Sequence, residues 1–147
     1  MLRNTAREIA IHLSYELSFN NTPIDTLLDQ RLTAETFSAL AEEDPIYAEA
    51  PNAKQAAYIR RLVKGVDDHA AELDSYISKY AKGWNFDRIP LVASAIMRVA
   101  MYEVLYMPDI PNSAAINEAV EIAKKYGQES SGGFVNAILA KIMKSGE

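Results

Sequence analysis

This sequence contains no cysteine, few residues that break helices, and no long uninterrupted apolar run. The lack of cysteine excludes disulfides, thiolate metal sites and cysteine nucleophiles. With six glycines and six prolines in 147 residues, most of the chain can be helical. No stretch reaches the roughly 18–20 apolar residues that a membrane-spanning helix needs. The N-terminal segment is too polar for a signal peptide, which predicts a cytoplasmic location without membrane association.

The net charge of −5 gives no overall excess of positive charge, whereas a nucleic-acid-binding protein usually carries a basic surface. The acidity is local, however. Residues 33–53 contain five acidic residues and no lysine or arginine, and outside this segment 15 acidic residues are balanced by 15 basic ones. The rest of the chain can therefore still present basic patches.

Apolar residues recur at helical spacing along the chain, and no segment alternates with the period of two that indicates a strand. We expect an all-α fold of about seven helices, in a single domain over residues 1–147, because this length suits one ordinary domain. A helical seam over residues 53–81 is interrupted near Gly65, which predicts either two helices or one kinked helix. Residues 42–52 contain two prolines and four acidic residues, which predicts a surface loop.

The most apolar stretch is residues 88–108, with a proline near each end. A helix that is apolar on all sides is buried on all sides in a protein that spans no membrane. We therefore expect a central core helix here. The residues predicted to be fully buried are Ile96, Val99 and Ala100.

Two charged residues, Arg98 and Glu103, lie inside this stretch, and we predict that they are structural core charges. Burying a charge is costly unless the charge is paired. The two residues are five apart, about 140° around a helix, so they cannot readily pair with each other. Each is expected to meet a partner from another element or a backbone carbonyl.

Candidates for catalysis and metal binding are few. The two histidines, His12 and His69, lie far apart in sequence, and neither has a convincing set of neighbours at metal-ligand spacing. The run at residues 67–69 fits a solvated helix face better than a ligand cluster. Residues 130–133 lack the lysine and the glycine spacing of a phosphate-binding loop. We expect no metal site, no cofactor and no enzymatic activity.

Three blocks of sequence occur in order over the second half of the chain. They are GWNFDRIPLVASAIMRVAMYE at residues 83–103, INEAVEIAKKYG at residues 116–127 and FVNAIL at residues 134–139. AREIA at residues 6–10 and Tyr15 add a fourth match near the N-terminus. Together these blocks resemble the NusB-type transcription antitermination factors, and the resemblance covers essentially the whole chain.

The resemblance implies a fold of two packed helical bundles that carries out no catalysis. It also implies a partnership with a small-subunit ribosomal protein, NusE, which doubles as a transcription factor. The pair would bind single-stranded boxA RNA of ribosomal RNA transcripts and act on the transcription elongation complex. Self-association as a homodimer is also compatible with the resemblance.

RNA contacts are expected mainly at the first helix, where Arg3 and Arg7 lie four residues apart on one side and Tyr15 offers a ring for stacking. Further candidates from the resemblance are Tyr80, Lys82 and Phe134.

Several positions depart from the family pattern and leave an alternative open. Asn4 and Thr5 stand where further arginines are common in the family, and residues 112–113 and 132–133 also lack the usual basic or aromatic side chains. Each missing cation removes a potential phosphate contact. The alternative is a divergent protein-interaction or dimerisation module of the same fold with little RNA affinity.

Overall fold

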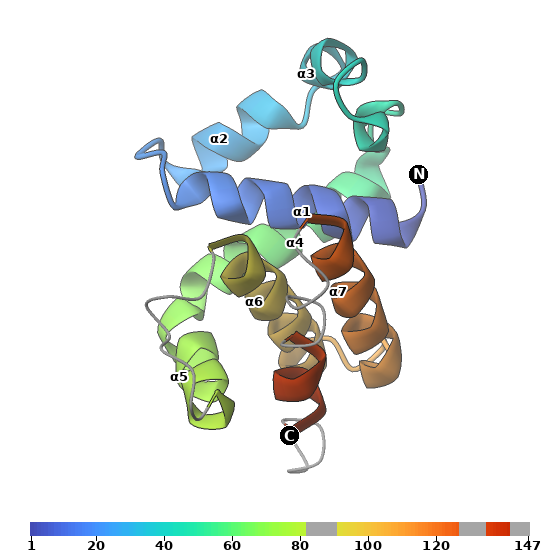
Figure 1. Cartoon of the computed structure of the whole chain (residues 1–147). Helices are drawn as coiled ribbons and strands as arrows, with labels where there is room; N and C mark the ends of the chain where they lie inside the picture. The colour runs from blue at the N-terminus through green and yellow to red at the C-terminus, as the bar shows by residue number, and fades with distance from the viewer. Residues whose placement is uncertain (82–90, 127–134, 142–147) are drawn as a thin grey trace. The chain divides into compact units, whose positions relative to one another are not determined.

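A computed structural model describes residues 1–81, 91–126 and 135–141 of the chain. Within these ranges the secondary structure is helical and contains no strand, which confirms the all-α prediction (Figure 1). The helices with described bounds are α1 (Arg3–Leu17), α2 (Ile24–Arg31), α3 (Ala34–Leu40), the short 3-10 helix η1 (Pro45–Tyr47), α4 (Ala53–Asp68), α5 (Ala70–Tyr80), α6 (Leu91–Tyr106) and α7 (Asn112–Tyr126). Residues 135–141 are helical as well.

The chain divides into two compact units, Met1–Lys64 and Gly65–Glu147. The first contains α1, α2, α3, η1 and most of α4, and the second contains the last turn of α4 with α5, α6 and α7. The expectation of a single domain over the whole chain stays a prediction. No helix among the described residues is long and apolar enough to cross a membrane.

Helix α1 is buried more completely than its sequence pattern suggested. The pattern predicts one apolar stripe, but six consecutive residues of the helix are buried, and Leu2 just before it is 76% exposed. A run of six residues passes around the whole circumference of a helix. Residues 6–11 of α1 are therefore covered on all sides, including the charged Arg7 and Glu8. The buried residues of α1 are Ala6, Arg7, Glu8, Ile9, Ala10, Ile11 and Leu13.

The acidic segment after α3 is more ordered than the predicted loop. It contains η1, and the side chain of Ile46 within it is only 9% exposed. The carboxylate of Asp44 caps η1 by accepting a hydrogen bond from the Ile46 backbone N–H at 3.1 Å. The buried Ile46 and the cap at Asp44 hold this segment in place.

The interrupted seam over residues 53–81 forms two helices, α4 and α5, which settles the choice that the sequence left open. The break is at His69, whose φ of −112° and ψ of 16° do not continue the helix. The apolar residues that recur along the seam in steps of four and three are mostly buried, as this spacing predicts. The buried ones are Ile59, Val63, Val66, Leu73 and Ile77.

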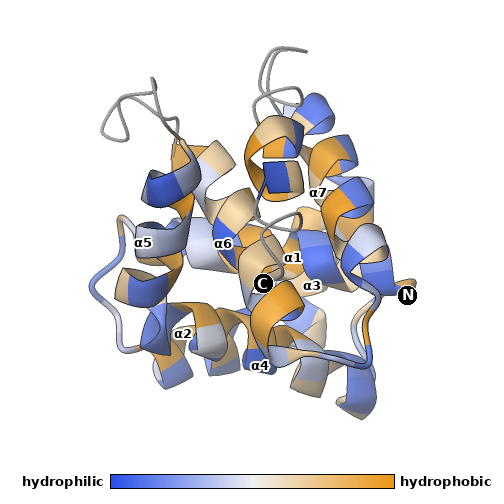
Figure 2. Cartoon of the chain, turned by 90° about the horizontal axis from the view of Figure 1, so that it is seen from below, coloured by the Kyte–Doolittle hydropathy of each residue, from blue (hydrophilic) through white to orange (hydrophobic). Residues whose placement is uncertain are grey.

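Helix α6 is the central core helix that its composition predicted. Ile96, Val99 and Ala100 are 1%, 0% and 1% exposed, which confirms their predicted burial. Figure 2 shows that helices such as α7 carry separate polar and apolar sides. Ten of the sixteen residues of α6 are by contrast buried.

The two charges in α6 have different environments. Arg98 binds Asp74 of α5 through two hydrogen bonds, Nε to Oδ1 at 2.6 Å and Nη2 to Oδ2 at 3.0 Å. Both side chains are partly exposed, at 22% and 31%, so Arg98 is not the buried charge that we expected. A long guanidinium side chain can reach from an apolar helix to the edge of the core. Glu103 is fully buried, as expected, and is engaged in an interaction within the protein.

Candidate nucleic-acid interface

Arg7, predicted as an RNA contact, is buried in the structure. It is 2% exposed, and its Nη1 donates a hydrogen bond to Asn4 Oδ1 at 2.8 Å. The prediction placed it on a solvated helix side with Arg3, but the helix is covered all round at this level. Arg7 is therefore not part of the surface that an RNA phosphate could reach.

Arg3 is exposed, one turn earlier in α1, and lies against α4. Its guanidinium carbon is 5.5 Å from the centroid of the Tyr58 ring, a cation–π arrangement. This contact holds the arginine at the surface beside α4 while its charge stays accessible.

Two more cations lie on the same side of α4 as Tyr58. Lys54 precedes Tyr58 by four residues and Arg61 follows it by three, and both side chains are exposed. Residues at this spacing share one side of a helix within about 60°. We call Arg3, Lys54, Tyr58 and Arg61 the basic patch. This patch was not predicted from the sequence, because the helical period of residues 53–81 is carried by their apolar residues.

Three other cations of the first unit are bound to carboxylates. Arg31 Nε donates to both oxygens of Glu16 at 3.1 Å, Arg60 pairs with Asp29 at 2.8 Å, and Lys64 pairs with Asp25 at 3.0 Å. The hydrogen bond with Glu16 raises the pKa of Arg31 above its usual value, against the opposing effect of burial. Each of these three cations therefore has its charge partly neutralised by a carboxylate.

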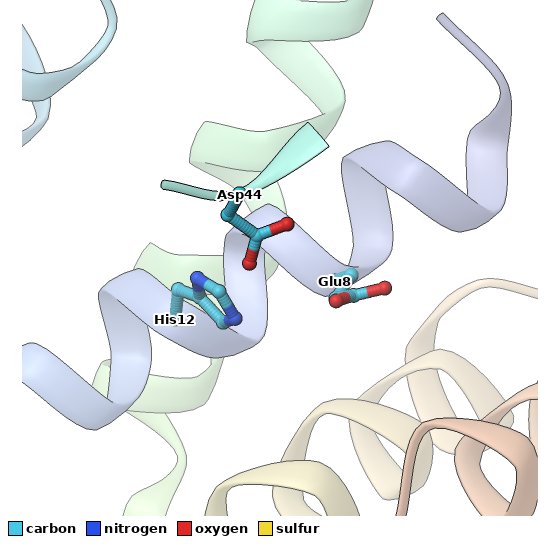
Figure 3. A group of neighbouring side chains, drawn as sticks. All are labelled: Glu8, His12 and Asp44. Carbon is cyan, nitrogen blue, oxygen red and sulfur yellow. The ribbon is translucent and has the colours of Figure 1, made fainter. Parts of the chain in front are cut away.

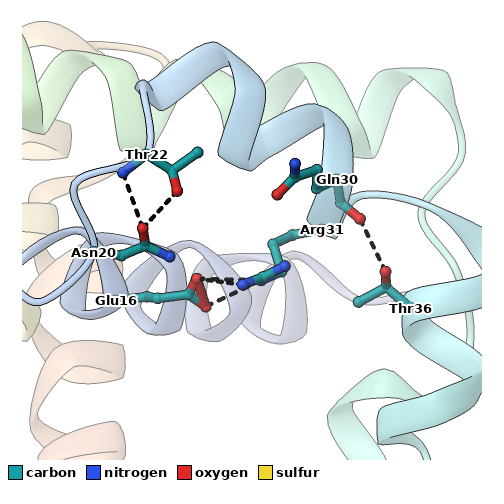
Figure 4. A network of polar contacts seen from close by, with 6 residues as sticks. All are labelled: Glu16, Asn20, Thr22, Gln30, Arg31 and Thr36. Carbon is teal, nitrogen blue, oxygen red and sulfur yellow. Dashed lines mark hydrogen bonds and ion pairs between the residues drawn. The ribbon is translucent and has the colours of Figure 1, made fainter.

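The Glu16–Arg31 pair is part of a polar network that joins α1, α2 and α3 (Figure 4). Asn20 Oδ1 accepts hydrogen bonds from the backbone N–H and the hydroxyl of Thr22, at 2.9 and 2.6 Å. The Thr36 hydroxyl donates to the Gln30 carbonyl at 2.9 Å. The Glu16–Arg31 pair connects α1 to α2, the Thr36–Gln30 bond connects α3 to α2, and the Asn20–Thr22 bonds fix the loop between α1 and α2. We therefore assign these contacts a structural role.

Aromatic side chains for stacking occur at the C-terminal end of α1. Tyr15 is half-buried, and Phe19, just beyond the helix, is 62% exposed. Their rings meet edge to face with centroids 5.0 Å apart. Tyr15 lies 12 residues after Arg3, which corresponds to about 18 Å along a helix. A single-stranded nucleic acid could extend over this distance with several nucleotides.

The remaining predicted contacts lie elsewhere or outside the described residues. Tyr80 ends α5 in the second unit, is half-buried, and has Lys79 Nζ 5.2 Å from its ring centroid. Lys82 and Phe134 lie outside the residues that the structure describes.

Comparison with known proteins gives a match over nearly the whole chain. The sequence profile of the NusB family matches residues 4–144. The transcription antitermination protein NusB of Symbiobacterium thermophilum is 37% identical over 145 residues, covering 98% of this chain and 90% of that protein. The protein of the same name from Acetivibrio thermocellus is 39% identical over 144 residues, with the same coverage of both chains.

Solved structures match the fold. T. maritima NusB has a TM-score of 0.81 at 30% identity, with coverage of 98% of this chain and 92% of that one. A second match is a structure of the antitermination factors NusB and NusE in complex with dsRNA. Its TM-score is 0.74 at 26% identity, and it covers 97% of this chain and 96% of the matched chain.

Proposed function

The chain belongs to the NusB family, and we propose that it is an RNA-binding transcription antitermination factor. It acts together with a small-subunit ribosomal protein, NusE, on boxA-like RNA of ribosomal RNA transcripts. The observation that carries this proposal is the match over 98% of the chain to proteins named as antitermination factors. The similarity to a NusB solved with NusE and RNA supports the same partners.

RNA is held by the first compact unit, with the basic patch as the phosphate-binding part. Arg3, Lys54 and Arg61 contribute positive charge from two helices that meet at Tyr58. Tyr15 and Phe19 stack on bases, since rings next to a positively charged surface are typical of single-strand binding. Tyr80, Lys82 and Phe134 remain further candidates on the basis of the family resemblance.

The protein works by binding and not by catalysis. Its effect is to hold RNA and a protein partner in the transcription complex, for which no group has to react chemically. It therefore acts in the cytoplasm, where bacterial transcripts are made.

The burial of Arg7 keeps one alternative in view, a protein-interaction module of the same fold with little RNA affinity. Arg7, one of the two arginines of the first helix that were expected to contact RNA, does not lie on the surface. Both proposals are decided by the same experiment.

The experiment titrates a boxA-like RNA against the protein with the ribosomal partner present, over a series of salt concentrations. The test variant is Arg3→Ala/Lys54→Ala/Arg61→Ala, and the matched control is Arg60→Ala, which removes a neighbouring cation that is paired with Asp29. We expect weaker binding by the triple variant and a salt slope lower by up to about 2, at about 0.7 per phosphate contact on a single strand.

The control variant should bind almost as wild type does. Equal loss in the triple variant and the control would argue against the basic patch as the RNA surface. Absence of measurable binding by the wild type with its partner would favour the interaction module.

A further inference from the structure

Three potential metal ligands meet in the first unit, and none of them belongs to the basic patch. Glu8 and His12 stand on successive turns of α1, and Asp44 belongs to the start of η1 (Figure 3). One ligand atom from each side chain lies within 4.8 Å of the others. Glu8 is buried, and the other two residues are half-buried. The sequence did not predict this group, because Asp44 is 32 residues away from His12 along the chain.

The His12 ring is held in place by a tyrosine. Its Nδ1 lies 2.8 Å from the Tyr47 hydroxyl oxygen, and the two rings are tilted with centroids 5.9 Å apart. With Nδ1–H donating to this oxygen, Nε2 is the ring nitrogen whose lone pair can bind an ion. Metal-binding histidines commonly have their second ring nitrogen fixed by such a partner.

The carboxylate of Asp44 is also held in place. Its Oδ1 accepts the Ile46 N–H at 3.1 Å, so the group is oriented at the beginning of η1 and retains its second oxygen. His12 and Tyr47 line a cavity of about 390 Å³, whose wall also includes Leu13 and Phe37. This cavity gives an ion or a water molecule access to His12.

We propose that Glu8, His12 and Asp44 form a binding site for a divalent transition-metal ion of the zinc class, which links α1 to the segment at η1. One imidazole nitrogen and two carboxylate oxygens form a ligand set that zinc accepts, and three protein ligands leave a coordination position for water. The double positive charge of the ion balances the two carboxylates. Mg²⁺ and Ca²⁺ prefer sites made of oxygen ligands alone.

The observed spacing is close to what such an ion requires. Tetrahedral zinc with bonds of about 2.0–2.2 Å has its ligand atoms roughly 3.3 Å apart. When an ion binds, the ligand atoms therefore have to move closer together by about an ångström or somewhat more. The competing interpretation is a charge cluster in which a protonated His12 lies between the carboxylates. In that case Zn²⁺ would have to displace the proton from His12, so it would bind weakly and would not raise the melting temperature.

The test uses the full chain, freed of metal with a chelator and then titrated with Zn²⁺ alone. We expect one equivalent to bind by calorimetry and the melting temperature to rise, because an ion that binds only the folded state stabilises it. Co²⁺ should give visible absorption bands of a site with nitrogen and oxygen ligands. A wild type without Zn²⁺ binding and without a change in melting temperature would overturn the proposal.

The variants locate the site. His12→Gln and Asp44→Asn should each weaken Zn²⁺ binding by more than about tenfold, and Tyr47→Phe should weaken it by about tenfold, as expected for loss of the group that orients the histidine. Asp44→Asn keeps the oxygen that caps η1, so it remains informative if His12→Gln fails to fold. The matched control is His69→Gln, which replaces the only other histidine of the chain.

The control should bind Zn²⁺ as wild type does. Loss of binding in His69→Gln with retention in Asp44→Asn would overturn the assignment of the site. Because none of these residues belongs to the basic patch, the result is independent of the proposed RNA role.

Discussion

The ring of Tyr102 in α6 occupies the space that a side chain at Gly65 of α4 would need. A Cβ atom at Gly65 would lie 2.7 Å from Tyr102 Oη and closer still to two ring carbons. Tyr102 is 8% exposed and stacks on Tyr106, with ring centroids 5.2 Å apart, so it has little room to move. Glycine inside a helix normally costs about 1 kcal/mol relative to alanine. The close approach of the ring explains why glycine stands here.

From this relationship we predict that Gly65→Ala destabilises the protein, although alanine favours helix formation. The overlap should cost about 1–3 kcal/mol and the gain in helix propensity should return about 1 kcal/mol. Urea unfolding measures the difference. In a Tyr102→Leu background the same substitution should be neutral or stabilising. A Gly65→Ala variant that is more stable than wild type would show that the ring moves aside freely.

The ion pair between Arg98 and Asp74 is predicted to contribute moderately to stability. Both hydrogen bonds involve charged groups and one of them is short, but solvent reaches both side chains and weakens the pair. We expect Arg98→Ala to lower the free energy of unfolding by about 1 kcal/mol. A double-mutant cycle with Asp74→Ala measures the coupling. A coupling energy indistinguishable from zero would assign the loss to packing of the arginine side chain.

The aromatic pair at the end of α1 gives a prediction for RNA binding that differs from that of the basic patch. Phe19→Ala and Tyr15→Ala should each weaken binding of boxA-like RNA by roughly 1–3 kcal/mol, with little change in the salt slope, because stacking involves no counterions. Phe19→Tyr keeps a ring and serves as the control. If Phe19→Ala binds RNA as tightly as Phe19→Tyr does, the bases stack elsewhere.

Tyr47 gives a prediction for pH dependence. Burial, together with the negative charges of Asp44, Glu16 and Glu8, raises the pKa of Tyr47 to about 12. The folded state thus favours the protonated phenol. The resulting contribution to stability is complete below about pH 10, the pKa of tyrosine in the unfolded chain, and is lost as the pH rises through about 12.

The measurement is a pH titration of the metal-free protein, followed by the ultraviolet absorption of tyrosinate. The curve of the Tyr47→Phe variant is subtracted from that of the wild type. The difference should show a midpoint near pH 12. A midpoint near pH 10 would mean that the phenol is solvated in the folded protein.

The sequence by itself predicted the fold class and the central core helix. An apolar composition on every side of residues 91–106 leaves burial as the only favourable environment, and the burial of Ile96 and Val99 follows from it. The interruption of the seam near Gly65 also predicted a break, which the structure places four residues later, at His69. These features are local, since they depend on residues within one or two helical turns.

Tertiary structure alone decided which polar side chains meet and which reach solvent. Arg7 and Arg3 are equivalent in the helical pattern, yet Arg7 is buried and Arg3 lies on Tyr58 of α4, which is 55 residues away along the chain. Glu8 and His12 share a helix face in the sequence, but Asp44 joins them only through the position of η1. The periodicity of a helix specifies its own faces, whereas the groups that pack on each face are set by the path of the whole chain.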